Sequence, residues 1–132
     1  MRMPSRLLAC LMLCAALAAG GEYLRWAELP DLPPAPGQTT QIGVAGPFAG
    51  VSNDALIVAG GANFPDAAPW EGGKKVWWDD AFVLAKGDDG TPQWITSAAL
   101  KLPRPLAYGA AVSAKGGVVC IGGCDADRCY RE

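Results

Sequence analysis

The sequence contains no histidine among its 132 residues. Histidine is the side chain that most readily exchanges protons near neutral pH. Its absence excludes His-based acid–base catalysis, Ser-His-Asp and Cys-His nucleophiles, and most zinc sites. Charged residues make up only 18% of the chain, and the net charge is −2 without a basic run. Nucleic acid and anionic membrane surfaces are therefore poor candidates for a partner.

Glycine, proline and apolar residues are abundant instead. Hydrophobic residues make up 51% of the sequence, which is enough for a buried core and argues against wholesale disorder. The 17 glycines and 11 prolines interrupt the chain often, so short strands joined by turns are favoured over long helices. The length suits one ordinary domain.

The first twenty residues have the pattern of an export signal. Arg2 and Arg6 precede an apolar run over 7–19, and small residues over 16–18 lead to a glycine pair. The run is shorter than the roughly 20 residues that span a bilayer, so we expect a cleaved signal peptide over 1–20. An uncleaved anchor and a lipoprotein modified at Cys10 are the alternatives. Residues 21–132 would then form a periplasmic or secreted domain without a membrane partner.

Three cysteines remain beyond the expected signal peptide, namely Cys120, Cys124 and Cys129. An odd number is unusual for an oxidising compartment, where cysteines tend to pair. The spacing allows a Cys124–Cys129 disulfide. No histidine is present to complete a metal site, so we expect no metal. Cys120 is expected to be a small buried residue of a strand.

An internal repeat organises the mature part of the sequence. Residues 54–61 form a short apolar run closed by a glycine pair, and residues 117–123 repeat this device 62 positions later. Asn53-Asp54 and residues 115–117 suit tight hairpin turns. Between the two glycine pairs, a long loop over 62–79 is followed by expected strands over 80–85 and 93–96. Four strands per repeat predict an all-β fold made of β-propeller blades.

We expect the glycine pair and the tryptophans to have structural roles. A glycine pair fits a strand end where another backbone packs so closely that a Cβ atom would clash. Trp94 is expected to cover the contact between blades, and Trp26 to begin the outer strand of an earlier blade. The sequence holds about two blades, whereas propellers close with four to eight.

The repeat resembles the kelch repeat, and a longer string is more specific. Residues 48–63, together with Gly73-Lys74-Lys75 and residues 104–109, resemble the N-acetylneuraminate epimerases, also called sialic acid mutarotases. The order of the blades resembles the cyclically permuted branch of that family. The resemblance implies an N-terminal fragment of an exported six-bladed kelch-type propeller. It also implies interconversion of the α and β anomers of N-acetylneuraminate without a cofactor.

A sugar acid has hydroxyl groups and a carboxylate to be recognised, and three residues are candidates for this substrate binding. Asn63 can orient hydroxyl groups or cap a turn. Lys75, or its neighbour Lys74, can bind a carboxylate or remain a solvated loop residue. Arg104 lies between two prolines, so it can be aimed at a carboxylate or form a structural ion pair. Arg128 is a more distant candidate.

No catalytic acid or base is assigned. Asp79 and Asp80 are adjacent, and as neighbours in a strand they are expected to point to opposite faces, which argues against an acid–base pair. Trp77 and Trp78 can stack on a sugar, although packing is the commoner use of tryptophan.

Two other functional interpretations stay open. A glycine-pair blade also suits a non-enzymatic kelch-type module that binds a glycan or a protein, because fold does not imply function. The second of these interpretations is a decayed or truncated gene product without activity. In every case the remaining propeller blades are expected to be needed for closure, because repeats bury their faces against neighbours.

Overall fold

The computed structural model describes residues 26–35 and 37–131. Every extended element in this part of the chain is a β-strand, and one short 3₁₀ helix, η1 (Pro69–Glu71), accompanies them. The expected all-β class is confirmed, while the expected signal peptide over 1–20 lies outside the described residues. No helix within 26–35 or 37–131 is long and apolar enough to cross a membrane.

The first repeat forms a four-stranded antiparallel sheet. Its strands β1 (Phe48–Ser52), β2 (Ala55–Ala59), β5 (Asp80–Lys86) and β6 (Pro92–Lys101) are neighbours in that order. β5 matches the strand expected over 80–85, whereas β6 runs well beyond the strand expected over 93–96. The turn between β1 and β2 is tight, as expected, and both Asn53 and Asp54 have positive φ angles, which suits a two-residue hairpin turn.

The second repeat contributes the hairpin of β7 (Ala110–Ala114) and β8 (Gly117–Ile121). Four strands of two residues each extend the ends of the two repeats, and two of them lie in the segment over 62–79, where the sequence suggested only a loop. Each is too short to show an alternating pattern. They are β3 (Ala62–Asn63) paired with β4 (Val76–Trp77), and β9 (Gly123–Cys124) paired with β10 (Cys129–Tyr130).

The repeat of 62 residues is also a repeat of structure. Ala45 forms an isolated antiparallel bridge with Ala62, and Ala107 forms one with Cys124. Adding 62 to both numbers of the first pair gives the second pair. The backbone N–H···O distances in the two bridges lie between 2.7 and 3.0 Å. The two repeats therefore share their local fold as well as their glycine pairs.

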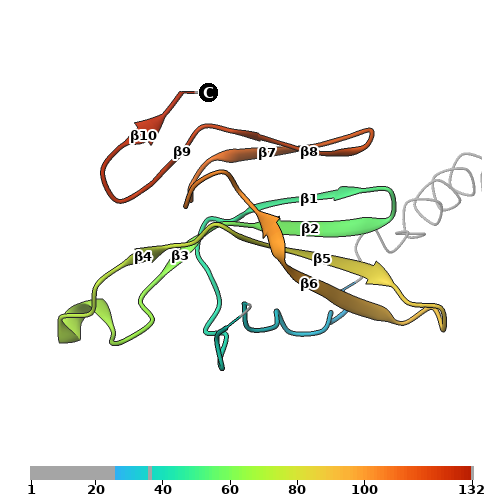
Figure 1. Cartoon of the computed structure of the whole chain (residues 1–132), viewed down its shortest axis with the longest axis horizontal. Coiled ribbons are helices and arrows are strands. Elements are labelled where there is room, and N and C mark those ends of the chain that lie inside the picture. The colour runs from blue at the N-terminus through green and yellow to red at the C-terminus, as the bar shows by residue number, and fades with distance from the viewer. Residues whose placement is uncertain (1–25, 36, 132) are drawn as a thin grey trace, which may run out of the picture.

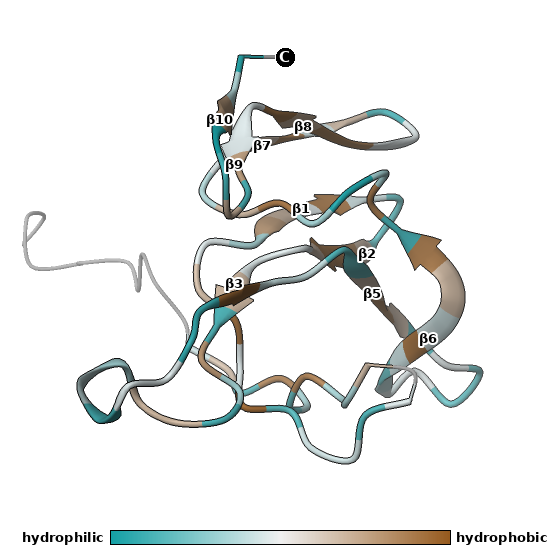
Figure 2. Cartoon of the chain, turned by 60° about the vertical axis from the view of Figure 1, so that its left-hand side comes forward, coloured by the Kyte–Doolittle hydropathy of each residue, from teal (hydrophilic) through white to brown (hydrophobic). Residues whose placement is uncertain are grey.

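Equivalent strands of the two repeats lie against each other. β7 and β8 lie beside β1, as Figures 1 and 2 show. The backbone N–H of Val51 donates to Ser113 Oγ over 2.9 Å, and Ser52 Oγ donates to the carbonyl of Ala114 over 2.8 Å. Both pairs span 62 residues, so each joins one position to its own counterpart in the next repeat.

Phe48 is the central core residue between the repeats, with 1% of its surface exposed. A Cβ atom at Gly109 would lie 2.3 Å from its ring, and one at Gly123 would lie 3.0 Å away. Two glycines of the second repeat thus make room for one aromatic ring of the first. Phe82 and Leu84 of β5 are buried on the face of the four-stranded sheet opposite Phe48.

The first glycine pair behaves as its sequence pattern predicts. Gly60 and Gly61 have φ angles of +67° and +99°, a region that side chains other than glycine rarely adopt. A Cβ atom at Gly60 would lie 2.3 Å from the carbonyl oxygen of Leu106, and one at Gly61 would lie 2.7 Å from Val44 Cβ. The close approach of neighbouring chain segments at this strand end is confirmed.

Two sequence expectations about individual residues are wrong, and a third, for Trp94, is not tested. Trp26 lies in no strand and is 91% exposed, because no neighbouring strand in the described part of the chain covers it. Trp94 packs edge-on against Phe82 of its own sheet, with 6.4 Å between ring centroids, and its indole N–H donates to Pro30 O over 2.9 Å; the two repeats meet through β1, β7 and β8, so its role between blades stays a prediction. Cys120 is exposed rather than buried, because within the described residues its strand pairs only with β7.

Candidate functional site

The longer connections gather at one end of the sheets. The segments over 60–79, 102–109 and 122–131 all leave or enter strands at this end, which we call the loop end, at the left of Figure 1. The short turns at 53–54, 87–91 and 115–116 lie at the opposite end. Every candidate binding residue of the sequence therefore falls at the loop end.

Backbone hydrogen bonds tie the segments of the loop end together. The N–H of Gly61 donates to Leu106 O over 2.8 Å, and the N–H of Leu106 donates to Trp78 O over 3.2 Å. The N–H of Trp78 donates in turn to Gly61 O over 2.9 Å. This closed cycle fixes the loop after β2 against the connection between β6 and β7, so side chains on both are held in defined positions.

Lys75 lies among three aromatic rings. Its Nζ atom is 4.6 Å from the ring centroid of Tyr108, 5.4 Å from that of Trp77 and 5.8 Å from that of Phe64. The negative face of an aromatic ring attracts a cation within about 6 Å. The ammonium group of Lys75 is therefore positioned by its surroundings, whereas Lys74 beside it is exposed.

The side-chain amide of Asn63 is a structural bridge. Its Nδ2 donates to the carbonyl of Gly43 over 2.7 Å, and its Oδ1 accepts the indole N–H of Trp78 over 2.8 Å. One N–H and one oxygen lone pair remain for other partners. These two hydrogen bonds fit the structural alternative, in which Asn63 fixes the local turn. The substrate-binding role of Asn63 stays a prediction.

Asn63 and Lys75 line the same open depression, which has a volume of about 500 Å³. Tyr108 and Phe64 contribute aromatic walls, and residues 42–45 also line the depression. A cation, an amide and aromatic faces around one depression can recognise a molecule that carries a carboxylate, hydroxyl groups and an apolar ring face.

Arg104 is placed elsewhere at the loop end. Its guanidinium carbon lies 4.7 Å from the ring centroid of Tyr130, and that of Arg128 lies at the same distance from this ring. Arg104 lines a separate depression of about 330 Å³ with Leu102 and Cys120. The structure thus brings together Asn63 and Lys75 but not Arg104, whose substrate-binding role stays a prediction.

The disulfide Cys124–Cys129, which the sequence left open, is formed. It closes the loop over 124–129, and the hydroxyl of Tyr130, directly after that loop, donates a short hydrogen bond to Asp125 Oδ2 inside it. This hydrogen bond, helped by the backbone N–H groups of Arg128 and Asp127, lowers the pKa of Asp125 to about 2. Asp125 is therefore an anion that organises its loop and is not suited to donate a proton near neutral pH.

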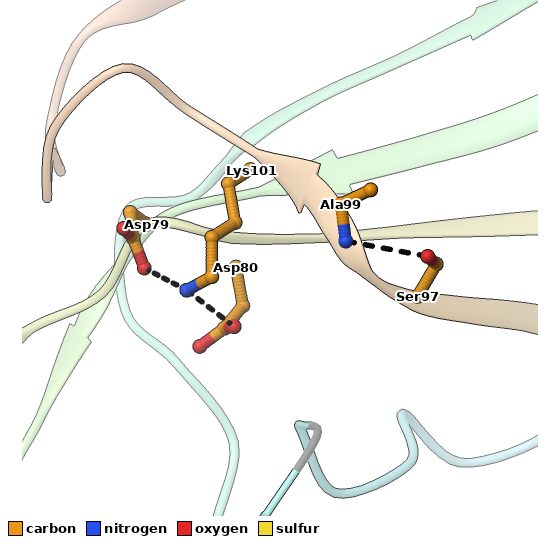
Figure 3. Close-up of polar contacts among 5 residues, drawn as sticks. All are labelled: Asp79, Asp80, Ser97, Ala99 and Lys101. Atoms are coloured by element: carbon orange, nitrogen blue, oxygen red, sulfur yellow. Dashed lines mark hydrogen bonds and ion pairs between the residues drawn. The ribbon is translucent and has the colours of Figure 1, made fainter.

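Asp79 and Asp80 both contact the ammonium group of Lys101, as Figure 3 shows, with Nζ–Oδ1 distances of 2.6 and 3.2 Å. The expectation that the two carboxylates point to opposite faces is wrong, because Asp79 precedes β5 and does not follow the alternation of the strand. The two aspartates raise the pKa of Lys101, Asp79 more than Asp80. The cluster is an ion pair that joins the ends of β5 and β6.

In residues 26–35 and 37–131, no three His, Cys, Asp or Glu side chains gather in a way that could hold a metal ion. Besides the aspartates and Lys101, the polar and aromatic groups described at the loop end are Lys75, the amide of Asn63, the rings around Lys75 and the Arg104–Tyr130–Arg128 stack.

Sequence reasoning missed the part played by Tyr108. Its ring lines the depression beside Lys75, although these residues are far apart in the sequence. A comparison of the two repeats would have drawn attention to it, since Tyr108 is the counterpart of Gly46, 62 positions earlier.

Comparison with known proteins decides the family. The model of the N-acetylneuraminate epimerase family matches residues 14–131. The chain belongs to the N-acetylneuraminate epimerase family. The resemblance found in the sequence is thereby confirmed.

Curated N-acetylneuraminate epimerases of several bacteria are similar to this chain. One from Brucella melitensis is 43% identical over 111 residues, covering 77% of this chain and 27% of its own length. One from Yersinia enterocolitica is 40% identical over 114 residues, with 78% and 27% covered. The chain thus spans about a quarter of the length of these relatives.

A solved structure, that of YjhT, has a similar fold. It superposes with a TM-score of 0.62 at 29% identity and covers 86% of this chain and 32% of its own. As with the curated epimerases, only part of the longer protein has a counterpart here.

Proposed function

We propose that this chain supplies part of the substrate-binding face of a sialic acid mutarotase, which interconverts the α and β anomers of N-acetylneuraminate. The family match over residues 14–131 carries the proposal. The depression around Lys75 and Asn63 supports it, because it offers a cation and a polar amide at the end where the connections meet. The substrate is N-acetylneuraminate or a related sugar acid.

The chemistry of mutarotation defines what a complete site must contain. A base removes the proton of the anomeric hydroxyl group while an acid protonates the ring oxygen, and ring closure reverses both transfers. A cation must also hold the carboxylate of the sugar. The described residues offer the cation, and none of their carboxylates is assigned as the acid or base. We therefore expect the isolated chain to bind but not to catalyse.

The proposal includes the architecture and the location of the protein. The two repeats are blades of a six-bladed kelch-type propeller of the cyclically permuted branch, and further blades complete the ring and the catalytic groups. The protein works in the periplasm or outside the cell. The Cys124–Cys129 disulfide supports this location, because such bonds persist in oxidising compartments.

A chimeric enzyme tests the proposal. Residues 26–131 replace the aligned segment of the Brucella melitensis epimerase, and proton NMR follows the exchange of N-acetylneuraminate anomers. We expect the chimera to exchange the anomers faster than the spontaneous rate. Lys75→Met should raise KM roughly tenfold or more, the value of a charge-assisted hydrogen bond. Lys115→Met, in the turn at the opposite end, is the matched control and should leave KM unchanged.

Other results with the chimera or the isolated chain would favour a different function. A folded chimera that binds the sugar without exchanging its anomers would favour the non-enzymatic glycan-binding module. A folded chimera that neither binds nor exchanges would contradict the proposed function. Anomer exchange by the purified 132-residue chain alone would show that a catalytic acid and base lie within it.

A further inference from the structure

Tyr108 has a backbone conformation that its residue type disfavours. Its φ angle is +64°, and its counterpart in the first repeat, Gly46, has a φ angle of +61°. Glycine adopts this left-handed region freely, whereas a bulky aromatic residue is strained there. The same fold therefore accepts glycine at this position, and the second repeat carries tyrosine instead.

Burial in the core does not account for this strain. Tyr108 is 47% exposed, so its ring gains only part of the burial that an aromatic core residue would have. Its backbone N–H donates to the carbonyl of Gly46 over 2.8 Å, a hydrogen bond that glycine at position 108 would also make. Strain that neither burial nor backbone pairing requires is typical of functional positions.

The ring of Tyr108 lies between two features of the loop end. On one side it rests against Gly46, where a Cβ atom would lie 2.4 Å from Tyr108 Cδ1. It also approaches Lys75 more closely than the other two rings do, with 4.6 Å between Nζ and the ring centroid. Gly46 thus supports the ring, and the ring supports the ammonium group.

We propose that Tyr108 is the positioning residue for Lys75: its ring holds the ammonium group at the depression so that Lys75 receives the carboxylate of a sugar acid. The proposal rests on the proposed function for the identity of the ligand. A long lysine side chain loses rotamer freedom when it binds an anion. Cation–π contacts restrict that freedom beforehand, which strengthens binding.

Four forms of the full chain separate this role from a structural one. Tyr108→Phe keeps the ring face, Tyr108→Leu keeps bulk without a ring, and Tyr108→Gly removes both the ring and the strain. We expect Tyr108→Phe to bind N-acetylneuraminate like the wild type. Tyr108→Leu and Tyr108→Gly should bind it roughly 3- to 10-fold more weakly, as expected for the loss of a cation–π contact. Saturation-transfer NMR at increasing sugar concentrations gives these affinities.

The methyl ester of N-acetylneuraminate is the matched control ligand, because it lacks the negative charge. We expect it to bind weakly and equally to all four forms. Thermal unfolding supplies a second readout: Tyr108→Gly should have a higher Tm than the wild type because the left-handed strain is relieved. Unchanged sugar affinity in Tyr108→Leu and Tyr108→Gly, or a lower Tm for Tyr108→Gly, would overturn the proposal.

A measurement without ligand distinguishes this inference from the proposed function. The ring current of Tyr108 should shift the side-chain proton signals of Lys75 upfield in the wild type and in Tyr108→Phe. Part of that shift should disappear in Tyr108→Leu and Tyr108→Gly. If the shift is present but the wild type binds no sugar acid, the proposed function fails while the positioning of Lys75 stands. If the shift is the same in all four forms, the positioning role fails.

Discussion

At the scale of single residues, Gly60 is constrained both by its backbone angle and by a close neighbour. Gly60 combines a φ angle of +67° with a carbonyl oxygen 2.3 Å from the position of a Cβ atom. We expect Gly60→Ala to lower the free energy of unfolding by about 2–4 kcal/mol, through backbone strain and steric overlap. Urea unfolding of the full chain measures the loss.

Gly90 is the matched control for this substitution. Its φ angle of +80° is similar, but nothing lies within 4 Å of the position of its Cβ atom. Gly90→Ala should therefore cost only the strain, about 1 kcal/mol. Equal losses at the two glycines would show that the approach of Leu106 to the glycine pair is not a constraint in solution.

Asp125 provides a prediction about acid. Its pKa of about 2 in the folded chain lies below its usual value of 3.8. The stabilisation from the Asp125 anion is thus fully present above pH 3.8 and is lost as the pH falls towards 2. Unfolding free energies from pH 6 to pH 2 should therefore show a gap between the wild type and Asp125→Asn that closes over this range.

Tyr130→Phe tests the cause of the lowered pKa. The Tyr130 hydroxyl is its largest cause, so this variant should lose part of the same pH dependence. A gap between the wild type and Asp125→Asn that stays constant from pH 6 to pH 2 would refute the assignment of this pKa shift.

At the scale of elements, the disulfide secures the pair β9–β10. These strands have two residues each, and Cys124 and Cys129 are directly paired in their register. Reduction, or the double substitution Cys124→Ser with Cys129→Ser, should lower the free energy of unfolding by about 2 kcal/mol, the chain-entropy value for a short loop. Cys120→Ser, at the exposed free cysteine, is the control and should leave stability unchanged. A double variant as stable as this control would rule out the stabilising role.

The longer strands were predictable because their signals are local. β1, β2, β5, β7 and β8 are apolar runs between turn residues, and both sides of each turn are close in the sequence. The two-residue strands were not predictable, because their pairing depends on how the loop end folds. Trp26 and Cys120 were misjudged for a related reason: burial depends on a neighbouring strand, and residue type alone does not reveal whether that neighbour is present.

The candidate site was predictable only in part. Lys75 and Asn63 were identified from the sequence and line one depression. The ring of Tyr108 beside Lys75 was missed because the contact joins two loops and depends on a left-handed backbone angle. Arg104 was identified as a cation of the site, but its stacking on Tyr130 depends on the loop that the disulfide closes.

At the scale of the whole molecule, we propose that the loop end of the repeats binds a sugar acid. The connections that carry Lys75, Asn63 and Tyr108 meet at the loop end, and the hairpin turns lie at the other end. The repeat architecture thereby separates the loop end from the end that carries the hairpin turns. Sugar binding should therefore be detectable by its location as well as by its affinity.

The most direct test is an amide NMR titration of the isotope-labelled full chain with N-acetylneuraminate. We expect the shifted signals to cluster over residues 62–64, 74–77 and 106–109. The signals of the turns at 53–54 and 115–116 should stay in place. Shifts concentrated in those turns, or no shift anywhere at saturating sugar, would show that the loop end does not bind this sugar acid.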